Sequence, residues 1–561
     1  MIKKEAKKSI QRRSFIKTAG AVAAGLTISP VDLFAMRRLN SQLHTTIEPN
    51  YNQLVSTTFD TLIEYGRDRY GKEHSPMFAA ILTQDTLKCP QEPPMFPSVS
   101  ARIDAGRMTR RAPGSANHFY DQFTFRAMDM LTELTGDPKY RNAVLDALHF
   151  NLNHAVDRRG FPALGGHISW NFYTDRANDQ DGDYHELWFM PMEWDLWWAA
   201  DPDKTRAYAD RIWEYHVVDK KTGETNRHSD KQHGWSFSWC DGTLMSAWSY
   251  AAVQTGDPKY HDWCRKVADY HWQRHNPKTG LISGSGGKYG QGVKRYDTTG
   301  FTTTVMPWAR NLLEIGQQLG DEEMVSMGRT ILDAYAQYGY NSDKGLFYAQ
   351  LTLDGKPVRP DAQREFVDGK GEPEGYLATW LPDAGWHEMP IYTAQLYTWA
   401  AEHVDRDAYL PIARRFGTIL IRAWEERYAG FDDWFAFRDA VQPFARERYK
   451  NEYNITHMRH VPKGDVDKQL IERYRQGGYV YQAPFGLFAD HYGRMIQYCS
   501  AMHRLSREPA WYNLAHEVGE EAVRYLWRDN LFVGHPDKTT YENTDQVGIL
   551  LLALLQLQKD D

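Results

Sequence analysis

Apolar positions along the chain recur with helical spacing, and two kinds of segment alternate. Stretches such as DQFTFRAMDMLTEL (121–134), DGTLMSAWSYAAV (241–253) and DQVGILLLALLQL (545–557) are apolar over most of their circumference, as fully buried helices are. The segments that follow the first two are apolar on one face only. This alternation predicts an inner ring of buried helices and an outer ring of amphipathic ones.

A short turn joins the two kinds of segment and repeats along the chain. LTGDPKYRNAVLDAL, from Leu134, is echoed by QTGDPKYHDWCRKVA, from Gln254, and weaker copies begin near residues 199, 319, 403 and 506. Aspartate is a favoured N-cap and proline fits the first helical position, so Asp137, Asp201 and Asp257 are predicted helix starts. The unit is helix, tight turn, helix and long loop, a repeat that stacks or closes on itself.

Over roughly residues 50–561, this unit resembles the six-hairpin glycosidase-like superfamily. The resemblance implies an all-α fold, an (α/α)6 toroid of helical hairpins. The buried segment near 543–557 could pair with the helical pattern near 51–69 to form a further hairpin. The sequence therefore does not decide between six and seven hairpins. We expect one toroid domain over residues 36–561.

The N-terminus reads as an export signal. IQRRSFIKTAGAVAAGLTISPVDLFA contains the twin arginines Arg12 and Arg13 before a moderately apolar run, a pattern typical of a Tat-type signal. We expect residues 1–35 to be removed and the protein to be exported, to the periplasm or beyond. No later stretch is long and apolar enough to predict a membrane span.

Charge and composition limit the classes of molecule that the protein is expected to bind. The formal net charge of −7 argues against nucleic acid, and the four cysteines, without paired spacing, predict buried thiols rather than a disulfide framework. Aromatic residues make up 14% of the chain, and Tyr and Trp suit both sugar stacking and a bulky core. The oligomeric state is not predicted.

In a toroid with short turns at one rim, the long loops and the inner-helix N-termini share the other rim. Ionisable and aromatic residues gather just before the predicted inner helices, where helix dipoles favour an anionic ligand. Besides the candidates named below, this rim includes Asp121, Asp490, His491 and Asp545. We expect the functional site there.

Two His-Glu steps stand at equivalent places on this rim, His185-Glu186 and His387-Glu388. A zinc-protease helix would need a second histidine at Phe189 or Ile391, so that interpretation fails. An EF-hand is excluded in NDQDGD because Ala177 and Trp188 would fall on ligand positions. Asp179, Asp181 and Asp183 could still hold a structural cation, and no cofactor is otherwise expected.

Paired carboxyl groups across a cavity suit glycoside hydrolysis, whereas a base with a group that neutralises a uronate carboxylate suits β-elimination. The expected catalytic residues are Glu186, Glu388, His387, His185, Tyr541 and Glu542. The expected substrate-binding residues are Asn117, His118, Arg227, His228, His233, Trp235, Asp241, Tyr296, Trp386 and Arg459. The alternative is helix capping for the carboxylates, core packing for Trp235 and Trp386, and a solvated surface loop for the insertion that carries Arg459.

The sequence therefore predicts an exported enzyme that acts on an acidic, uronate-containing glycan. A glycoside hydrolase is favoured because glutamate recurs at the helix mouths. A polysaccharide lyase is the main alternative, and a sugar epimerase a lesser one. A non-catalytic glycan-binding protein would not need convergent ionisable groups.

Overall fold

The computed structural model describes residues 49–90, 114–166, 168–178, 185–187, 191–284, 299–343, 345–348, 350–357, 390–425, 427–428, 432–436, 487–536 and 538–560. Within these ranges the chain is mainly helical, with short two- and three-stranded sheets between the helices. The all-α class predicted from the hydrophobic pattern is confirmed.

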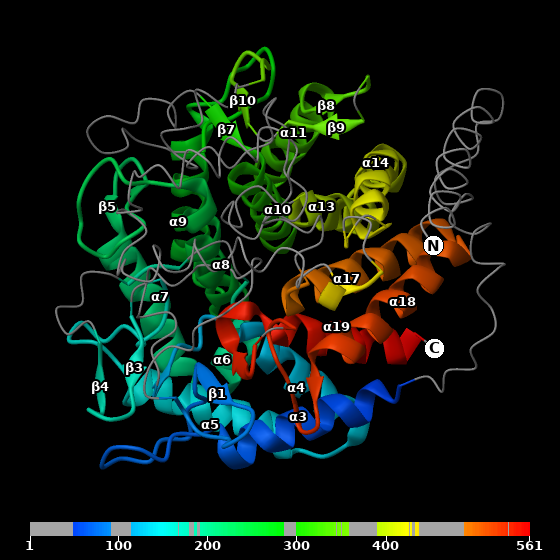
Figure 1. Cartoon of the computed structure of the whole chain (residues 1–561). Coiled ribbons are helices and arrows are strands. Elements are labelled where there is room, and N and C mark those ends of the chain that lie inside the picture. The colour runs from blue at the N-terminus through cyan, green and yellow to red at the C-terminus, as the bar shows by residue number, and fades with distance from the viewer. Residues whose placement is uncertain are drawn as a thin grey trace, which may run out of the picture.

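Seven buried helices follow one another around a closed ring in the described part of the chain (Figure 1). They are α4 (Gln122–Thr135), α6 (Trp194–Ala200), α8 (Ser238–Thr255), α10 (Thr302–Leu319), α13 (Pro390–His403), α17 (Ala489–Ser506) and α19 (Val547–Asp560). Helix α19 packs against α4, which closes the ring. The short α6 is tied to α4 because the Trp197 indole N–H donates to Gln122 Oε1 at 3.1 Å.

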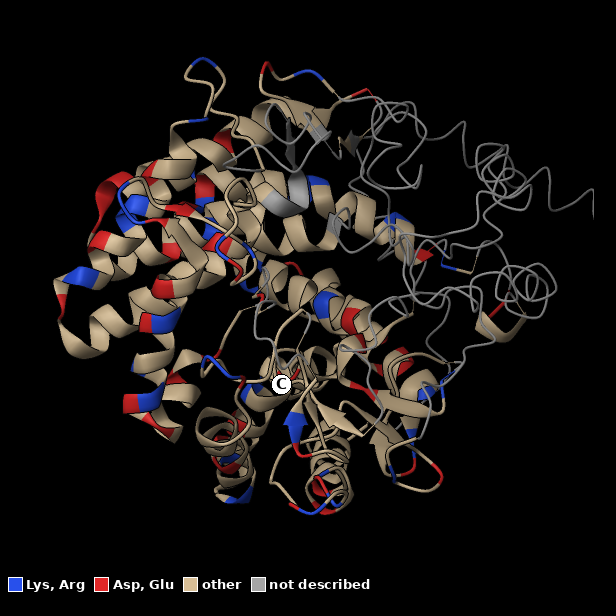
Figure 2. Ribbon diagram, turned by 90° about the vertical axis from the view of Figure 1, so that its left-hand side faces the viewer, with Lys and Arg blue, Asp and Glu red and all other residues tan. Residues whose placement is uncertain are grey.

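An outer helix accompanies each inner one. The outer helices are α3 (Tyr51–Tyr65), α5 (Lys139–Asn153), α7 (Pro202–His216), α9 (Pro258–Trp272), α11 (Glu322–Tyr338), α14 (Arg406–Glu425) and α18 (Pro509–Leu526). Charged residues of both signs are interspersed along these outer helices (Figure 2). The α/α toroid is confirmed, and the described helices form seven pairs.

The seventh pair joins the two ends of the described chain. Helix α3 packs on α19, and the backbone N–H of Tyr51 donates to Gln558 Oε1 at 3.0 Å. Strand β1 (Ile81–Thr83) pairs antiparallel with β13 (Thr540–Glu542), with Ile81 opposite Glu542. These contacts hold the ring closed between segments that are distant in sequence.

The predicted turns have the expected physical basis. Gly136 and Gly256 end α4 and α8 with positive φ angles of 73° and 68°, which glycine adopts without strain. The Asp201 and Asp257 side chains then accept backbone N–H groups at the starts of α7 and α9. Asp137 likewise accepts from the Lys139 N–H at 3.0 Å, but the N-cap position of α5 is Pro138, one residue later than predicted. Short, capped turns therefore fix one rim.

Short strands occupy the longer connections. These are β2 (Ser115–Ala116), β3 (Trp170–Asn171), β4 (Arg176–Ala177), β5 (Val217–Asp219), β6 (Glu224–Thr225), β7 (Thr299–Phe301), β8 (Tyr340–Asn341), β9 (Leu346–Phe347), β10 (Gln350–Thr352), β11 (Trp527–Arg528) and β12 (Leu531–Phe532). The four cysteines are buried free thiols, as predicted. In the described part of the chain, no helix has the length and hydropathy that a membrane span requires.

Candidate active site

A carboxylate, a guanidinium and an imidazole meet at the long-loop rim. Glu186 lies in the connection between β4 and α6, and Arg227 and His228 lie between β6 and α8. Arg227 Nε and His228 Nε2 are each 3.6 Å from Glu186 Oε1. The Glu186 side chain is fully buried, whereas those of Arg227 and His228 keep 12% and 13% exposure. We call these three residues the Glu186 centre.

The loop that carries Arg227 is fixed by local contacts. The Arg227 N–H donates to the Trp235 carbonyl at 3.1 Å, and the His228 N–H donates to Asn226 Oδ1 at 2.8 Å. The Arg227 guanidinium lies 5.6 Å from the ring centroids of both Trp235 and Phe237. A guanidinium is weakly hydrated and packs well on aromatic rings, so these rings orient its charge.

Asn117 holds the segment beside Glu186 in place. Its side-chain amide donates to the Gly165 carbonyl at 2.9 Å and accepts the Gly165 N–H at 3.0 Å. Gly165 has φ of 116°, and a Cβ there would lie 2.3 Å from the Glu186 carbonyl oxygen. The close approach of two loops therefore requires glycine at this position, and Asn117 acts on Glu186 through it.

His185, next to Glu186 in sequence, is fully buried and contacts two other buried side chains. Its Nδ1 lies 2.8 Å from His216 Nε2 and its Nε2 lies 2.8 Å from the Tyr208 hydroxyl. His216 Nδ1 in turn lies 2.8 Å from the Asn226 carbonyl oxygen. Burial lowers the pKa of His185 well below its usual value and that of His216 to about 4, so both rings are neutral near pH 7. They link the Glu186 segment to the Arg227 loop.

Asp241 supports the same loop from below. Its Oδ2 accepts the Thr225 hydroxyl at 2.5 Å and the Ser236 hydroxyl at 2.9 Å, and lies 2.6 Å from His271 Nε2. These partners come from β6, the loop and α9, while Asp241 itself lies in the first turn of α8. Asp241 thus joins four elements behind Arg227.

Of two predicted substrate-binding histidines, one is buried and the other is exposed. His118 is fully buried, its Nε2 accepts the Phe78 N–H at 3.3 Å, and burial lowers its pKa to about 3. His233 is 69% exposed and lies 2.8 Å from Glu224 Oε2. Neither makes a described contact with the Glu186 centre.

A second charged group lies where β13 leads into α19. The Lys538 ammonium pairs with Asp545 and lies 3.5 Å from Glu542 Oε2, and all three side chains are buried. Glu542 Oε1 also accepts the Thr540 hydroxyl at 3.0 Å. We call Lys538, Glu542 and Asp545 the Lys538 cluster.

Asp121 and Tyr541 lie next to this cluster. Asp121 Oδ2 accepts the Asn543 amide at 3.2 Å, and burial raises the pKa of Asp121 to about 8. Burial also raises the pKa of Tyr541 far above its usual value, and the charge of Asp121 raises it further. Both groups are therefore protonated at neutral pH. The Asn543 amide also donates to the Asn117 carbonyl at 3.2 Å, which connects this region to the Glu186 segment.

Two residues of the Glu186 centre, Glu186 and His228, are of types that bind metal ions in proteins. Two protein ligands held at about 2.1 Å from one tetrahedral ion lie roughly 3.4 Å apart, close to the 3.6 Å between Glu186 and His228. Among the described residues, no group of three His, Cys, Asp or Glu side chains could complete a site.

Several predicted residues lie outside the described ranges. They are Glu388, His387, Trp386, Tyr296, Arg459 and the three aspartates Asp179, Asp181 and Asp183. The sequence-based selection also passed over Gly165, His216 and Lys538. The positive φ of Gly165 and the pairing of His216 have no local sequence signal, because both depend on contacts between loops.

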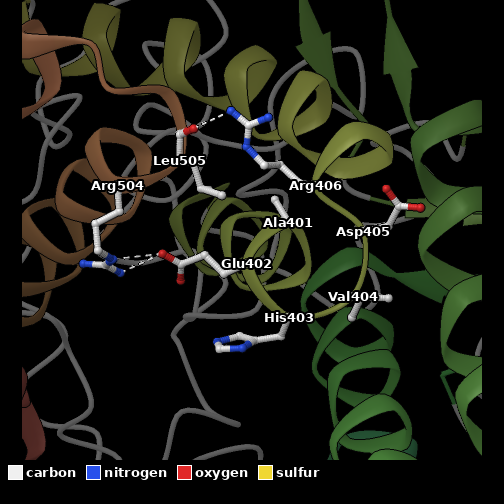
Figure 3. A pocket seen from close by; sticks show the side chains of 8 residues that line it. All are labelled: Ala401, Glu402, His403, Val404, Asp405, Arg406, Arg504 and Leu505. Atoms are coloured by element: carbon white, nitrogen blue, oxygen red, sulfur yellow. Dashed lines mark hydrogen bonds and ion pairs between the residues drawn. The ribbon is translucent and has the colours of Figure 1, made fainter.

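An open pocket of about 710 Å³ lies at the opposite, short-turn rim. It lies between the α13–α14 turn and the end of α17, where Arg504 pairs with Glu402 at 2.9 Å and Arg406 donates to the Leu505 carbonyl at 2.8 Å (Figure 3). Two of its charged side chains thus pair with each other, and its lining contains none of the predicted site residues.

Comparisons with solved structures return proteins of diverse activity. A family 76 glycoside hydrolase from a bovine Bacteroides thetaiotaomicron strain has a TM-score of 0.43 and 9% identity, over 91% of this chain and 78% of that one. An unsaturated glucuronyl hydrolase specific for heparin has a TM-score of 0.44 and 11% identity, over 91% and 97%. A D-mannose isomerase has a TM-score of 0.44 and 10% identity, over 92% and 100%.

A family model matches a segment that contains the Glu186 centre. Residues 109–241 are similar to the family described as periplasmic pectate lyase. The matched segment runs from before Asn117 to Asp241 and includes Glu186, Arg227 and His228.

Proposed function

We propose that this protein is a polysaccharide lyase that cleaves a uronate-containing glycan by β-elimination. The observation that carries the proposal is the Glu186 centre, where two basic side chains meet a buried carboxylate inside the segment similar to periplasmic pectate lyases. By the same similarity and the twin-arginine pattern, we propose that it works in the periplasm after export.

β-Elimination needs a neutralised carboxylate and a base. Pairing the uronate carboxylate with a cation makes the adjacent C5 proton acidic. In the proposed reaction the base removes that proton, a C4–C5 double bond forms, and the C4–O bond breaks. The departing oxygen takes up a proton, and no water is consumed.

Two side chains of the centre suit these roles. Arg227, packed against two aromatic rings, supplies a fixed positive charge that can pair with the uronate carboxylate. His228 is the group of the centre whose ordinary pKa allows it to accept a proton near neutral pH. Glu186, between them, orients both and offsets their charge.

A divalent cation offers a second arrangement of the same reaction. The spacing of Glu186 and His228 suits a shared ion, which would neutralise the uronate carboxylate and make His228 a ligand instead of the base. Dialysis against a chelator distinguishes the two. Retained turnover supports the direct arrangement, and loss that added Zn²⁺ or Mn²⁺ restores supports the ion.

Hydrolysis is the alternative that the sequence favoured. One observation supports it: Asp121 is a carboxyl group that burial keeps protonated, as a general acid must be. Asp121 is, however, enclosed by β13 and Asn543, whereas Arg227 and His228 keep some exposure.

The reaction type is tested by incubating the protein with polygalacturonate and with glucuronate-containing polymers. A lyase releases chains ending in an unsaturated uronate, which absorbs in the near ultraviolet, with no equivalent of water added to the product mass. Reducing ends that appear without this absorbance would contradict elimination and support hydrolysis.

A further inference from the structure

The hairpin of β3 and β4 lies at the edge of the molecule (Figure 1) and carries a half-exposed aromatic side chain. Tyr173, in the turn between these strands, is 48% exposed. Large aromatic side chains are normally buried on one side at least, and an exposed ring that is held still is suited to stacking on a sugar.

The Tyr173 ring is held by its neighbours. It packs directly on the backbone of Gly114, where φ is +60° and an added Cβ would lie 2.2 Å from the ring atom Cε2. Tyr70 lies against another side, with ring centroids 5.2 Å apart and planes at 57°. Tyr70 is itself fixed, because its hydroxyl accepts the Cys89 N–H at 2.8 Å. Tyr173 is therefore a pre-organised platform.

This platform is connected to the Glu186 centre through β2. Gly114 immediately precedes β2, which pairs with β3, and Asn117 follows three residues later. Three residues of extended chain span roughly 10 Å. The Asn117 side chain bonds Gly165, whose backbone lies against Glu186. A short series of direct contacts thus joins the hairpin that carries Tyr173 to the Glu186 centre.

Basic side chains accompany the platform. Arg176, in β4, and Lys72 are both exposed, and the Lys72 backbone N–H donates to Asp175 Oδ2 at 3.1 Å, which brings the 67–78 loop to the hairpin. In the described ranges neither the Arg176 nor the Lys72 side chain has an ion-pair partner. Arg176 and Lys72 therefore place positive charge near the aromatic face, beside the carboxylate of Asp175, and positive charge with an aromatic ring suits an acidic sugar.

We propose that Tyr173, with Tyr70, Arg176 and Lys72, forms a distal subsite that binds a sugar unit of an acidic glycan chain whose reacting unit occupies the Glu186 centre. The proposal rests on the proposed function for the identity of the chain. Binding at a distance from the bond that breaks makes long chains better substrates than short ones.

The test compares Tyr173→Ala with wild type on galacturonate oligomers of two lengths, a dimer and a hexamer. Calorimetry measures hexamer binding in a Glu186→Gln background, where turnover is suppressed, and kcat/KM is measured for both oligomers in the active background. Removing the ring should weaken hexamer binding about three- to tenfold, the range expected for one aromatic contact. The kcat/KM for the dimer should not change.

Three further variants identify the cause. Tyr173→Phe keeps the ring and should behave as wild type. Phe435→Ala removes an exposed aromatic side chain beside α18 and should leave both oligomers unaffected. The double variant of Arg176→Gln and Lys72→Gln should weaken hexamer binding and flatten its dependence on salt.

The outcomes separate this proposal from the proposed function. If wild type cleaves the hexamer and Tyr173→Ala binds and cleaves it equally well, the subsite is overturned while the lyase stands. If wild type does not cleave but binds the hexamer in a Tyr173-dependent way, the subsite stands and the lyase assignment falls. An equal loss for dimer and hexamer would place Tyr173 in a structural role and overturn the subsite.

Discussion

Two charged regions on the same rim are built in different ways. In the Glu186 centre Arg227 Nε and His228 Nε2 are each 3.6 Å from the Glu186 carboxylate, longer than a hydrogen bond, and two of the three side chains keep some exposure. In the Lys538 cluster the ammonium is buried in direct contact with Asp545. The first arrangement leaves room for a ligand to change its partners. The second compensates buried charge and joins the chain before β13 to the start of α19.

The comparison predicts that substitutions in the Glu186 centre reduce activity, whereas substitutions in the Lys538 cluster reduce stability. Glu186→Gln keeps the shape of the side chain and removes its charge, so activity should fall by a factor on the order of 10² to 10⁴. The thermal midpoint should move little. Initial rates on a uronate polymer and thermal unfolding of the same preparation check this. His233→Gln, at an exposed position on the neighbouring loop, is the matched control and should retain wild-type rates.

Lys538→Met should show the reverse pattern. The substitution leaves Asp545 and Glu542 buried without their cation, and breaking a buried pair from one side costs roughly 3–5 kcal/mol of unfolding free energy. Urea unfolding measures that loss, and kcat below the unfolding transition should stay within a few-fold of wild type. Adding Asp545→Asn should recover part of the stability. A variant that is stable but inactive would instead place Lys538 in the chemistry.

The buried histidines should couple stability to pH without touching substrate. Since the folded-state pKa values of His185 and His216 lie below their unfolded values, the unfolded chain binds more protons, and stability is lost as pH falls from about 6.5 toward 4. His216→Gln should reduce this dependence and lower kcat about tenfold, with KM nearly unchanged, through displacement of the Arg227 loop. Unfolding at several pH values, with kinetics at pH 7, tests both effects. An unaltered pH dependence would show that His216 does not titrate in this range.

These contrasts explain how far the sequence could lead. The ring of helices was predictable because its signals are local in sequence. Inner helices are apolar around their whole circumference, and Gly-Asp-Pro turns end one helix and start the next, as at Gly256 and Asp257. The approximate rim followed from that ring. The contacts between site residues could not be predicted in this way. Gly165 contacts Glu186 and His185 contacts His216 across segments that are distant in sequence, and no local pattern indicates that these segments approach each other. Adjacent residues can also have different partners: His185 contacts His216 and Tyr208, whereas Glu186 lies near Arg227 and His228.

The smallest expected effect concerns Asp121, which lies between the two regions. Its pKa is raised by burial to about 8, far above that of an unfolded aspartate, so its contribution to stability is full below about pH 4 and is lost as pH rises through 8. Asp121→Asn cannot ionise and should remove this loss. The unfolding free energy of the variant, relative to wild type, should therefore increase by at most about 1.4 kcal/mol per pH unit as pH rises toward 8, and the difference should level off above pH 8. Guanidinium unfolding between pH 6 and 9 measures the slope. A constant difference would mean that Asp121 is already ionised and paired in the folded protein, and the argument for a protonated carboxyl on this rim, and with it the support for hydrolysis, would be lost.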